Sequence, residues 1–368
     1  MAQLDKYSAK IQELNEHGNL RILRNGVPEG MINLSSNDYL GLQQNEELYD
    51  EFLDEISIHN YRFTAASSRL LSGNSVEYHT LEILLQQLYN REAALVFNSG
   101  YHANCGILPA LAGARDLVVA DKLVHASLID GMRLGQAQYE RFRHLDYEHL
   151  DTILAEHAHN YENIFIVTES IFSMDGDRAN LVELVKIKNK YNALLYVDEA
   201  HAVGVYGERG LGLCEEMNLV HECDFIVGTF GKALASVGAY VICNDLFKTY
   251  LINHARTLIF TTALPPINLA WTHFILNQLH TFTKQRQTLA KLSSQFAQLL
   301  GVNAQSHIIP YIIGDNKDAI ACSEHLQNNG FFVLPIRYPT VAKNTARLRF
   351  SLQATHSINN LQKIVSLL

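Results

Sequence analysis

The chain has 368 residues, of which 48% are hydrophobic and 18% are charged, and its formal net charge at pH 7 is −9. This length allows one large domain and a smaller one with a sizeable core, and the negative charge argues against a broad surface for nucleic acid. The five cysteines are scattered, with no CxxC pair and no Cys/His cluster at zinc spacing, so the sequence predicts neither a disulfide framework nor a metal site.

The N-terminal stretch 1–18 predicts an amphipathic helix that ends at Gly18. Its apolar residues recur at helical spacing among many charges: Leu4, Tyr7, Ile11 and Leu14. We do not interpret this stretch as a signal peptide, and no apolar run elsewhere is long enough to span a bilayer. We therefore expect a cytoplasmic protein that does not bind membranes.

From about residue 80 to 245, short apolar runs rich in β-formers alternate with helical stretches. One such stretch, 180–192, opens with Asn180 as a helix N-cap. This alternation indicates an α/β fold with a mostly parallel sheet covered by helices. The expected strands are 93–99, 116–121, 163–170, 193–199, 224–230 and 238–244.

Polar residues follow several of these runs, and ligands bind at the carboxyl ends of strands in such folds. Residues 98–99, 169–170 and 198–199 and Thr229 occupy these positions. Beyond Pro265 the pattern changes to a long helical stretch and then short strands, which predicts a smaller C-terminal α+β domain. We expect an N-terminal helix and arm at 1–45, a large domain at 46–268, and the small domain at 269–368, which packs with the N-terminal segment.

Residues 198–201 read DEAH, the signature tetrapeptide of a helicase family. A helicase also needs a phosphate-binding loop of the form GxxxxGK[ST] before this acid, and no such loop precedes Asp198. The pair Gly231-Lys232 comes afterwards and is followed by Ala233, which offers no hydroxyl for magnesium. The sequence therefore disfavours an ATPase.

Asp198 and Lys232 follow two successive predicted strands, and taken alone they fit a structural ion pair as well as a functional site. A site for pyridoxal 5′-phosphate (PLP) needs both groups: a lysine amine for the Schiff base and a carboxylate facing the ring nitrogen. Residues 98–102, between a strand and a helical run, are suited to the phosphate, and Thr229 could add a hydroxyl.

Eight stretches, spread over nearly the whole chain, resemble the α-oxoamine synthase family of PLP enzymes. In chain order they are LSSNDYLGL (34–42), SSRLLSGN (67–74), FNSGYHAN (97–104), DKLVHASLIDGMRLG (121–135), TESIFSMDGDRANL (168–181), YVDEAHAVGVYGERGLG (196–212), GTFGKA (228–233) and IRYPTVAKNTARLRFSL (336–352). The resemblance implies fold type I, the aspartate aminotransferase-like fold of PLP-dependent transferases.

The same resemblance implies a role for each matched residue. Lys232 holds PLP and acts as general base, Asp198 faces the pyridinium nitrogen, His201 binds the phenolic oxygen, and His125 stacks on the ring. The remaining cofactor contacts are Gly100, Tyr101, Ser173, Thr229 and, from the partner subunit of a homodimer with an interfacial active site, Thr262. The implied substrate contacts are Arg337, which clamps the amino acid carboxylate, with Asn37, His125, and Arg21 and Thr340 near the acyl group.

Within this family the chain most resembles the branch that condenses L-alanine with a pimeloyl thioester and releases CO₂, through SRLLSGN, FRHLDYEHL, SMDGD and the IRYPTV…TARLR tail. Sister enzymes that join glycine to acetyl- or succinyl-CoA, or serine to a long acyl chain, stay open. The intact lysine, acid and two histidines speak against a PLP-free paralogue that serves as a subunit or scaffold. The sequence leaves open whether CoA or acyl carrier protein delivers the acyl group, and how long that group is.

Overall fold

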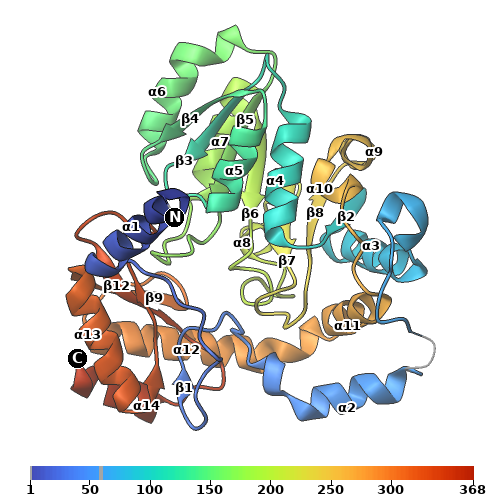
Figure 1. The fold of residues 1–368 in the computed structure, drawn as a ribbon. Helices are drawn as coiled ribbons and strands as arrows, with labels where there is room; N and C mark the ends of the chain where they lie inside the picture. The colour runs from blue at the N-terminus through green and yellow to red at the C-terminus, as the bar shows by residue number, and fades with distance from the viewer. Residues whose placement is uncertain (1, 58–60) are drawn as a thin grey trace. The chain divides into compact units, whose positions relative to one another are not determined.

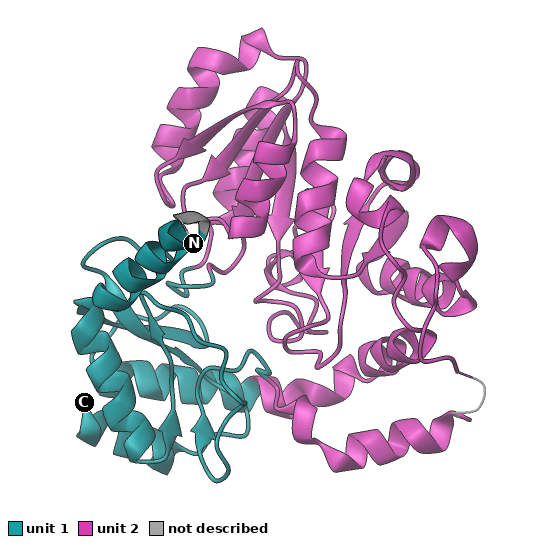
Figure 2. Cartoon of the chain, viewed as in Figure 1, with its two compact units in different colours: residues 1–39, 173–177, 287–368 teal, residues 40–172, 178–286 magenta. Residues whose placement is uncertain are grey.

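The computed structural model describes residues 2–57 and 61–368, which fall into two compact units (Figure 2). Unit 1 comprises residues 1–39, 173–177 and 287–368, and unit 2 comprises residues 40–172 and 178–286. The units interleave along the chain because residues 173–177 leave the middle of unit 2 and pack in unit 1. The domain borders at 45/46 and 268/269 stay a prediction.

Unit 2 is built on one mixed sheet, whose strands are labelled in Figure 1. In the described chain its strand order is β2-β8-β7-β6-β5-β3-β4, and only β8 runs antiparallel to its neighbours. The bounds are Ala93–Phe97 (β2), Leu117–Asp121 (β3), Gln138–Phe142 (β4), Ile164–Glu169 (β5), Leu194–Asp198 (β6), Phe225–Thr229 (β7) and Ala239–Cys243 (β8). The predicted mostly parallel sheet is confirmed.

Strand β4 was not expected from the sequence, because QYERF lacks a continuous apolar run. It lies at the edge of the sheet, where four of its five residues are not fully buried. The six expected strands are instead almost wholly buried, as strands covered on both faces should be.

Helices of unit 2 pack on this sheet. Helix α3 contacts β2, α4 contacts β7 and β8, α6 contacts β4, and α7 contacts β6. As predicted, the side chain of Asn180 caps α7, accepting the Glu183 N–H at 3.1 Å. The helices are Glu46–Glu55 (α2), Val76–Tyr89 (α3), Gly100–Leu111 (α4), Ala126–Leu134 (α5), Tyr147–His157 (α6), Leu181–Tyr191 (α7), Leu213–Glu216 (α8), Asp245–His254 (α9), Arg256–Ile259 (α10) and Pro266–Asn277 (α11).

Unit 1 contains a three-stranded antiparallel sheet in the order β11-β12-β9, and β1 pairs with β10 in parallel. Strand β12 is buried along its whole length, so this strand is central to the small core. The elements are Ala2–Glu16 (α1), Ile32–Asn33 (β1), Ile308–Gly314 (β9), Asn316–Asn328 (α13), Phe331–Phe332 (β10), Pro335–Ile336 (β11), Ala346–Ser351 (β12) and Ile358–Leu367 (α14). Helix α12, Thr283–Leu300, begins in unit 2 and continues in unit 1.

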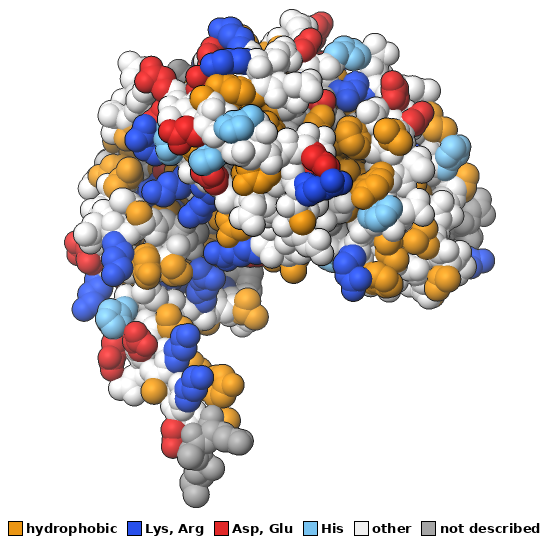
Figure 3. All heavy atoms as spheres, turned by 90° about the horizontal axis from the view of Figure 1, so that it is seen from above, with side chains coloured by type: hydrophobic (Ala, Val, Ile, Leu, Met, Phe, Trp, Pro, Cys, Tyr) orange, Lys and Arg blue, Asp and Glu red, His pale blue; other side chains and the backbone are white. Residues whose placement is uncertain are grey.

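The predicted N-terminal helix is α1, and its apolar residues are exposed in this single chain: Leu4 by 70%, Tyr7 by 65% and Ile11 by 55%. Among the described helices, none combines the length and the apolar character needed to cross a bilayer. On the face seen in Figure 3, basic and acidic side chains are interspersed with apolar ones.

Candidate active site

The carboxyl ends of the parallel strands of unit 2 bring the predicted polar residues to one edge of the sheet (Figure 1). Glu169 ends β5, Asp198 ends β6 and Thr229 ends β7, and Lys232 follows β7 by three residues. Glu169 and Asp198 are direct partners in the β5–β6 ladder, and both are almost completely buried. This edge therefore concentrates ionisable groups away from solvent.

Lys232 and His201 are in direct contact. The Nζ atom of Lys232 lies 2.8 Å from Nε2 of His201, and the histidine is only 4% exposed. The contact spans 31 residues of sequence, so it is made by the fold and not by local geometry. An amine and an imidazole at this distance can share a proton, which is a useful property beside a reacting carbonyl or phenolic group.

Asp198 is held by a residue that sequence analysis missed. Its Oδ2 accepts the Asn104 Nδ2–H at 2.7 Å, and its Oδ1 accepts the Ala200 N–H at 2.9 Å. Asn104 lies in α4 and is 1% exposed, among apolar neighbours. A fully buried amide must find polar partners. An asparagine within an apolar helical segment was therefore the sequence feature that could have indicated this role.

His125 connects β3 to α5 and caps that helix, because its ring accepts the Ser127 N–H at 3.2 Å. Burial lowers the pKa of His125; the nearby carboxylate of Asp198 opposes this effect and the charge of Lys232 adds to it. The structure therefore brings His125 into the same electrostatic environment as Asp198 and Lys232.

Glu169 is a second buried acid that sequence analysis did not assign. Burial raises the pKa of Glu169 well above its ordinary value, and the neighbouring Asp198 raises it further. Within the described chain its Oε1 atom is buried without a hydrogen-bond partner. The raised pKa favours the neutral form of Glu169 beside Asp198.

The N-terminus of α4 offers the backbone donors that the predicted anion site requires. Ser99 caps the helix by accepting the His102 N–H at 3.2 Å, and the first N–H groups of a helix have no acceptor within it. A Cβ at Gly100 would lie 3.9 Å from the Cβ of Thr229, so the hydroxyl-bearing strand end adjoins the helix start. Phosphate groups bind at such helix N-termini.

Two further predicted residues lie near this helix start. The backbone oxygen of Thr262 accepts the Asn98 Nδ2–H at 2.6 Å, and the Tyr101 hydroxyl donates to Asp130 at 2.7 Å. That bond to Asp130 raises the pKa of Tyr101 to about 12. An amine, a buried carboxylate and a helix N-terminus are together what a PLP site requires, so the residues of unit 2 fit this cofactor.

In unit 1, a second group of polar residues surrounds Arg349, which sequence analysis did not assign. This arginine is 8% exposed and donates to the Ser173 carbonyl, to Ser351 Oγ at 2.5 Å, and to Asn37 Oδ1 at 3.2 and 3.3 Å. All three partners are neutral. Its neighbour Arg347 is instead ion-paired with Asp175.

A buried guanidinium without a carboxylate is costly unless a ligand supplies the negative charge. Among the described residues, no ion pair involves Arg349. Its Nη2 group makes the two longest of its bonds, to Asn37 Oδ1 at 3.3 Å and to the Tyr39 hydroxyl at 3.5 Å, and neither partner supplies a negative charge. The arrangement of Arg349 and Asn37 is therefore suited to a small carboxylate.

The predicted substrate residues Arg337, Arg21 and Thr340 also lie together in unit 1. Arg21 donates to the Thr340 hydroxyl at 3.1 Å, and Arg337 donates to the Gly18 carbonyl. Burial lowers the pKa of Arg337, and the charges of Arg21 and Arg24 lower it further. These arginines therefore form a basic cluster whose charges repel one another.

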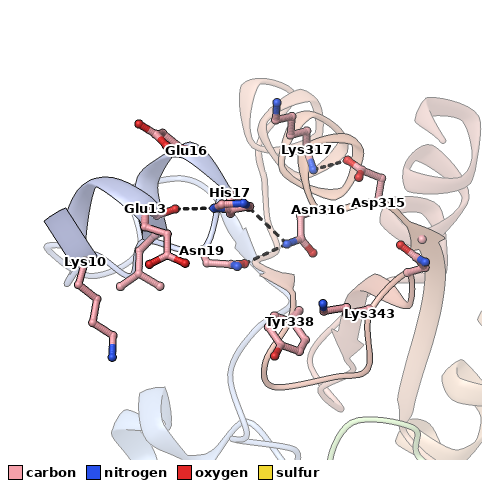
Figure 4. A pocket seen from close by; sticks show the side chains of 13 residues that line it. Lys10, Glu13, Glu16, His17, Asn19, Asp315, Asn316, Lys317, Tyr338 and Lys343 are labelled. Atoms are coloured by element: carbon pink, nitrogen blue, oxygen red, sulfur yellow. Dashed lines mark hydrogen bonds between the residues drawn. The ribbon is translucent and has the colours of Figure 1, made fainter.

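A cavity of about 580 Å³ in unit 1 is lined by Tyr338, the residue that follows Arg337 (Figure 4). Asn316 is one of its lining residues and donates to Asn19 Oδ1 at 2.9 Å. The lysines of its lining are Lys10, Lys317 and Lys343, and its acids are Glu13, Glu16 and Asp315. The three lysines and three acids of the lining therefore carry balanced formal charges.

Glu199, the second residue of the DEAH segment, has a structural role. Glu199 is completely buried and accepts the Ser170 hydroxyl at 2.5 Å and the Leu213 and Cys214 N–H groups at 3.1 and 2.6 Å. These bonds lie within unit 2, so this acid, which directly follows β6, ties that strand to the first turn of α8 and is not free to bind magnesium.

Comparisons with known proteins agree with this geometry. The family model described as aminotransferase class I and II matches residues 29–368. A putative 8-amino-7-oxononanoate synthase of Glaesserella parasuis is 49% identical, over 99% of this chain and 100% of the relative. One of Haemophilus influenzae is 48% identical, over 98% and 99% respectively.

Two kinds of solved structure are also similar. A serine palmitoyltransferase of S. paucimobilis with a bound PLP-myriocin aldimine has a TM-score of 0.88 at 29% identity, covering 100% of this chain and 96% of that one. An 8-amino-7-oxononanoate synthase of Francisella tularensis has a TM-score of 0.79 at 30% identity, covering 92% and 97%. These likenesses confirm the predicted fold type.

Proposed function

The chain belongs to the aminotransferase class I and II family, and from that premise we propose that it is an 8-amino-7-oxononanoate synthase of biotin biosynthesis. As a member of the PLP-dependent C-acyltransferases in this family, it uses PLP as its cofactor. The proposed reaction joins L-alanine to a pimeloyl thioester with loss of CO₂. The observation that carries this proposal is the identity of 48–49% to two putative synthases over almost their whole lengths.

The closest competing function is that of a serine palmitoyltransferase, whose backbone superposes with the higher TM-score, 0.88 against 0.79. A TM-score reports the course of the backbone, whereas substrate choice depends on side chains. The sequence identity is 29% to the S. paucimobilis enzyme and 49% to the G. parasuis relative, and this difference favours the synthase.

When bound, PLP supplies an aldehyde for an amine and a protonated ring that draws electrons from the substrate's α-carbon. We assign Lys232 to the aldehyde, Asp198 to the ring nitrogen, His201 to the phenolic oxygen and His125 to the ring face. The phosphate is assigned to the N–H groups of Gly100 and Tyr101 and to the hydroxyls of Thr229 and, from the partner subunit of a homodimer, Thr262. Ser173 stays a proposed contact of the cofactor.

The amine of Lys232 is the proposed general base for the α-proton of alanine. Its contact with His201, at 2.8 Å, supports this role because the imidazole can take up or return a proton as the amine cycles. Asp198, held at Oδ2 by Asn104 and at Oδ1 by the Ala200 N–H, is oriented before any ligand arrives. Such preorganisation means that little free energy is spent on positioning during the reaction.

For the alanine carboxylate we propose Arg349 together with Asn37, and retain Arg337 as a second candidate. The burial of Arg349 and its neutral partners support this assignment, because a planar guanidinium binds a carboxylate through two hydrogen bonds. Arg21 and Thr340, which contact each other at 3.1 Å, are assigned to the acyl substrate.

The proposal is tested by product analysis. Purified holoprotein is given alanine with pimeloyl-CoA or pimeloyl acyl carrier protein, glycine with acetyl-CoA, and serine with palmitoyl-CoA, and the products are identified by mass spectrometry. We expect 8-amino-7-oxononanoate from the mixture of alanine and pimeloyl thioester, and no product from the glycine and serine mixtures. A Lys232→Ala variant should form no product and should lack the visible absorption of the bound cofactor. Turnover only with glycine or serine would assign the chain to a sister enzyme.

A further inference from the structure

A continuous chain of hydrogen bonds joins His125 to Asp198 in unit 2. Nδ1 of His125 lies 2.7 Å from Ser127 Oγ, Ser127 Oγ accepts from Asn104 Nδ2 at 2.9 Å, and the same Nδ2 donates to Asp198 at 2.7 Å. Ser127 and Asn104 are each 1% exposed, so water does not compete for these bonds. The chain links two residues that are 73 positions apart in sequence through side chains alone.

The orientation of the Asn104 amide follows from its neighbours. A carboxylate only accepts hydrogen bonds, so the Asn104 atom that faces Asp198 is the NH₂ nitrogen. The amide oxygen then faces Tyr196, whose hydroxyl donates to it at 2.6 Å. Both hydrogens of the NH₂ group are thereby used, one on Asp198 and one on Ser127.

The direction of the next bond is fixed in turn. Since Ser127 Oγ accepts from Asn104, its own hydrogen is free to point to His125 Nδ1 at 2.7 Å. The backbone N–H of Ser127 points to the same nitrogen at 3.2 Å. A ring nitrogen that faces two donors is an unprotonated acceptor. With the opposite tautomer, the Ser127 N–H would face the ring N–H, and the buried hydroxyl hydrogen would lose its acceptor.

We propose that Ser127 and Asn104 are positioning residues that fix His125 as the neutral tautomer with its proton on Nε2. The charged and titratable groups around His125 are Asp198, Lys232 and Asp130, and its backbone N–H donates to the Glu169 carboxyl. Burial has the largest effect on the pKa of His125 and lowers it, which agrees with a neutral ring.

The consequence for chemistry rests on the function proposed above. A histidine fixed in this tautomer presents a single N–H donor, at Nε2, and that donor can polarise the developing keto oxygen when CO₂ leaves. Because Asn104 also holds Asp198, the same two side chains orient the group that faces the ring nitrogen and the group that donates to the substrate.

The tautomer can be read directly in solution. Protein with ¹⁵N-labelled histidine is recorded in a two-bond ¹H–¹⁵N correlation spectrum, with and without PLP, and a His125→Asn spectrum assigns the signal. We expect the pattern of the Nε2–H tautomer, in which Nδ1 has the shift of an unprotonated nitrogen. The pattern of the Nδ1–H tautomer in wild-type protein would overturn the inference, whatever the variants do.

The Ser127→Ala variant tests the mechanism. Losing a hydrogen bond to the neutral ring should raise the midpoint of His125 titration by about 0.5–1 pH unit and allow the second tautomer to appear. Ser293→Ala is the matched control, because it removes a buried hydroxyl of unit 1 whose bond, among the described residues, is to Leu289 in its own helix, at 2.7 Å. An unchanged midpoint and a single tautomer in Ser127→Ala would contradict the proposal.

The two proposals fail separately. If wild-type protein shows the Nε2–H pattern but makes no 8-amino-7-oxononanoate, the inference on His125 stands and the proposed function falls. If the product forms while His125 carries its proton on Nδ1, the proposed function stands and the inference on His125 falls.

Discussion

Replacing Arg349 by lysine tests the proposed carboxylate site most sharply, because the change keeps the charge and removes the planar fork. In the wild type, Arg349 donates to Ser173, Ser351 and Asn37 and is only 8% exposed. A lysine ammonium is a point charge and does not form two parallel bonds with a carboxylate. We therefore expect the loss of one charge-assisted hydrogen bond to alanine, worth about 1.5–3 kcal/mol.

That loss corresponds to a decrease of about 10- to 150-fold in kcat/KM for alanine. The assay measures initial rates against alanine concentration at saturating thioester, together with the alanine-induced change in cofactor absorption. KM for the thioester should change much less, since the acyl group is assigned to Arg21 and Thr340.

Arg347→Lys is the matched control. Arg347 lies in the same strand, is 5% exposed, and already has Asp175 as its ion-pair partner, so a lysine there keeps its counterion. We expect its kcat/KM for alanine to stay within about threefold of wild type, because a compensated ion pair loses little when the charge is kept. Equal losses in the two variants, or none in Arg349→Lys, would refute the assignment of Arg349.

Three further outcomes follow from the site and its surroundings. Asp198→Asn should still bind PLP but lose about 10- to 150-fold in activity or more, because a neutral amide does not stabilise a protonated ring nitrogen; full activity together with normal cofactor absorption would argue against the role of Asp198. Glu169→Gln should change the free energy of unfolding by about 1 kcal/mol or less, since a neutral acid is replaced by a neutral amide; a loss of several kcal/mol in denaturant titration would show that Glu169 is charged. Burial lowers the pKa of His356 to about 4, against about 6.5 in an unfolded chain. In the window between these values the unfolded chain binds the proton more readily than the folded one. The neutral ring therefore contributes about 3 kcal/mol to the free energy of unfolding, which is fully present above pH 6.5 and is lost as the pH falls toward 4. His356→Gln should flatten this slope in urea unfolding between pH 4 and 6.5, and an unchanged slope would contradict it.

Most of the sheet could be predicted because its strands are buried on both faces and therefore appear as continuous apolar runs. Strand β4 was not predicted for the complementary reason. It lies at the edge of the sheet, where side chains exposed to solvent need not be apolar, and QYERF shows no recognisable hydrophobic period. Helix α7 was predictable down to its cap, since capping by Asn180 depends only on residues three positions apart.

The residues of the candidate site also fall into a predicted group and a missed group. Lys232, His201 and Asp198 follow strand ends or lie in motifs shared with a known family, and the contact of Lys232 with His201 agrees with that grouping. Asn104 and Arg349 were missed because their partners are distant in sequence, 94 residues away for Asn104 and Asp198. The pattern ARLRFS also resembles a strand with one solvated face, and only folding shows that both of its arginines are buried.

The insertion of residues 173–177 into unit 1 has a consequence for how the protein is made. During synthesis this segment leaves the ribosome about 170 residues before strand β12, whose Arg347 and Arg349 later bind Asp175 and Ser173. Until residues 346–351 have emerged, the loop lacks the guanidinium groups that anchor it. A premature stop that removes β12 would therefore leave Asp175 and Ser173 without these partners and remove Arg349 from the proposed pocket for the amino acid.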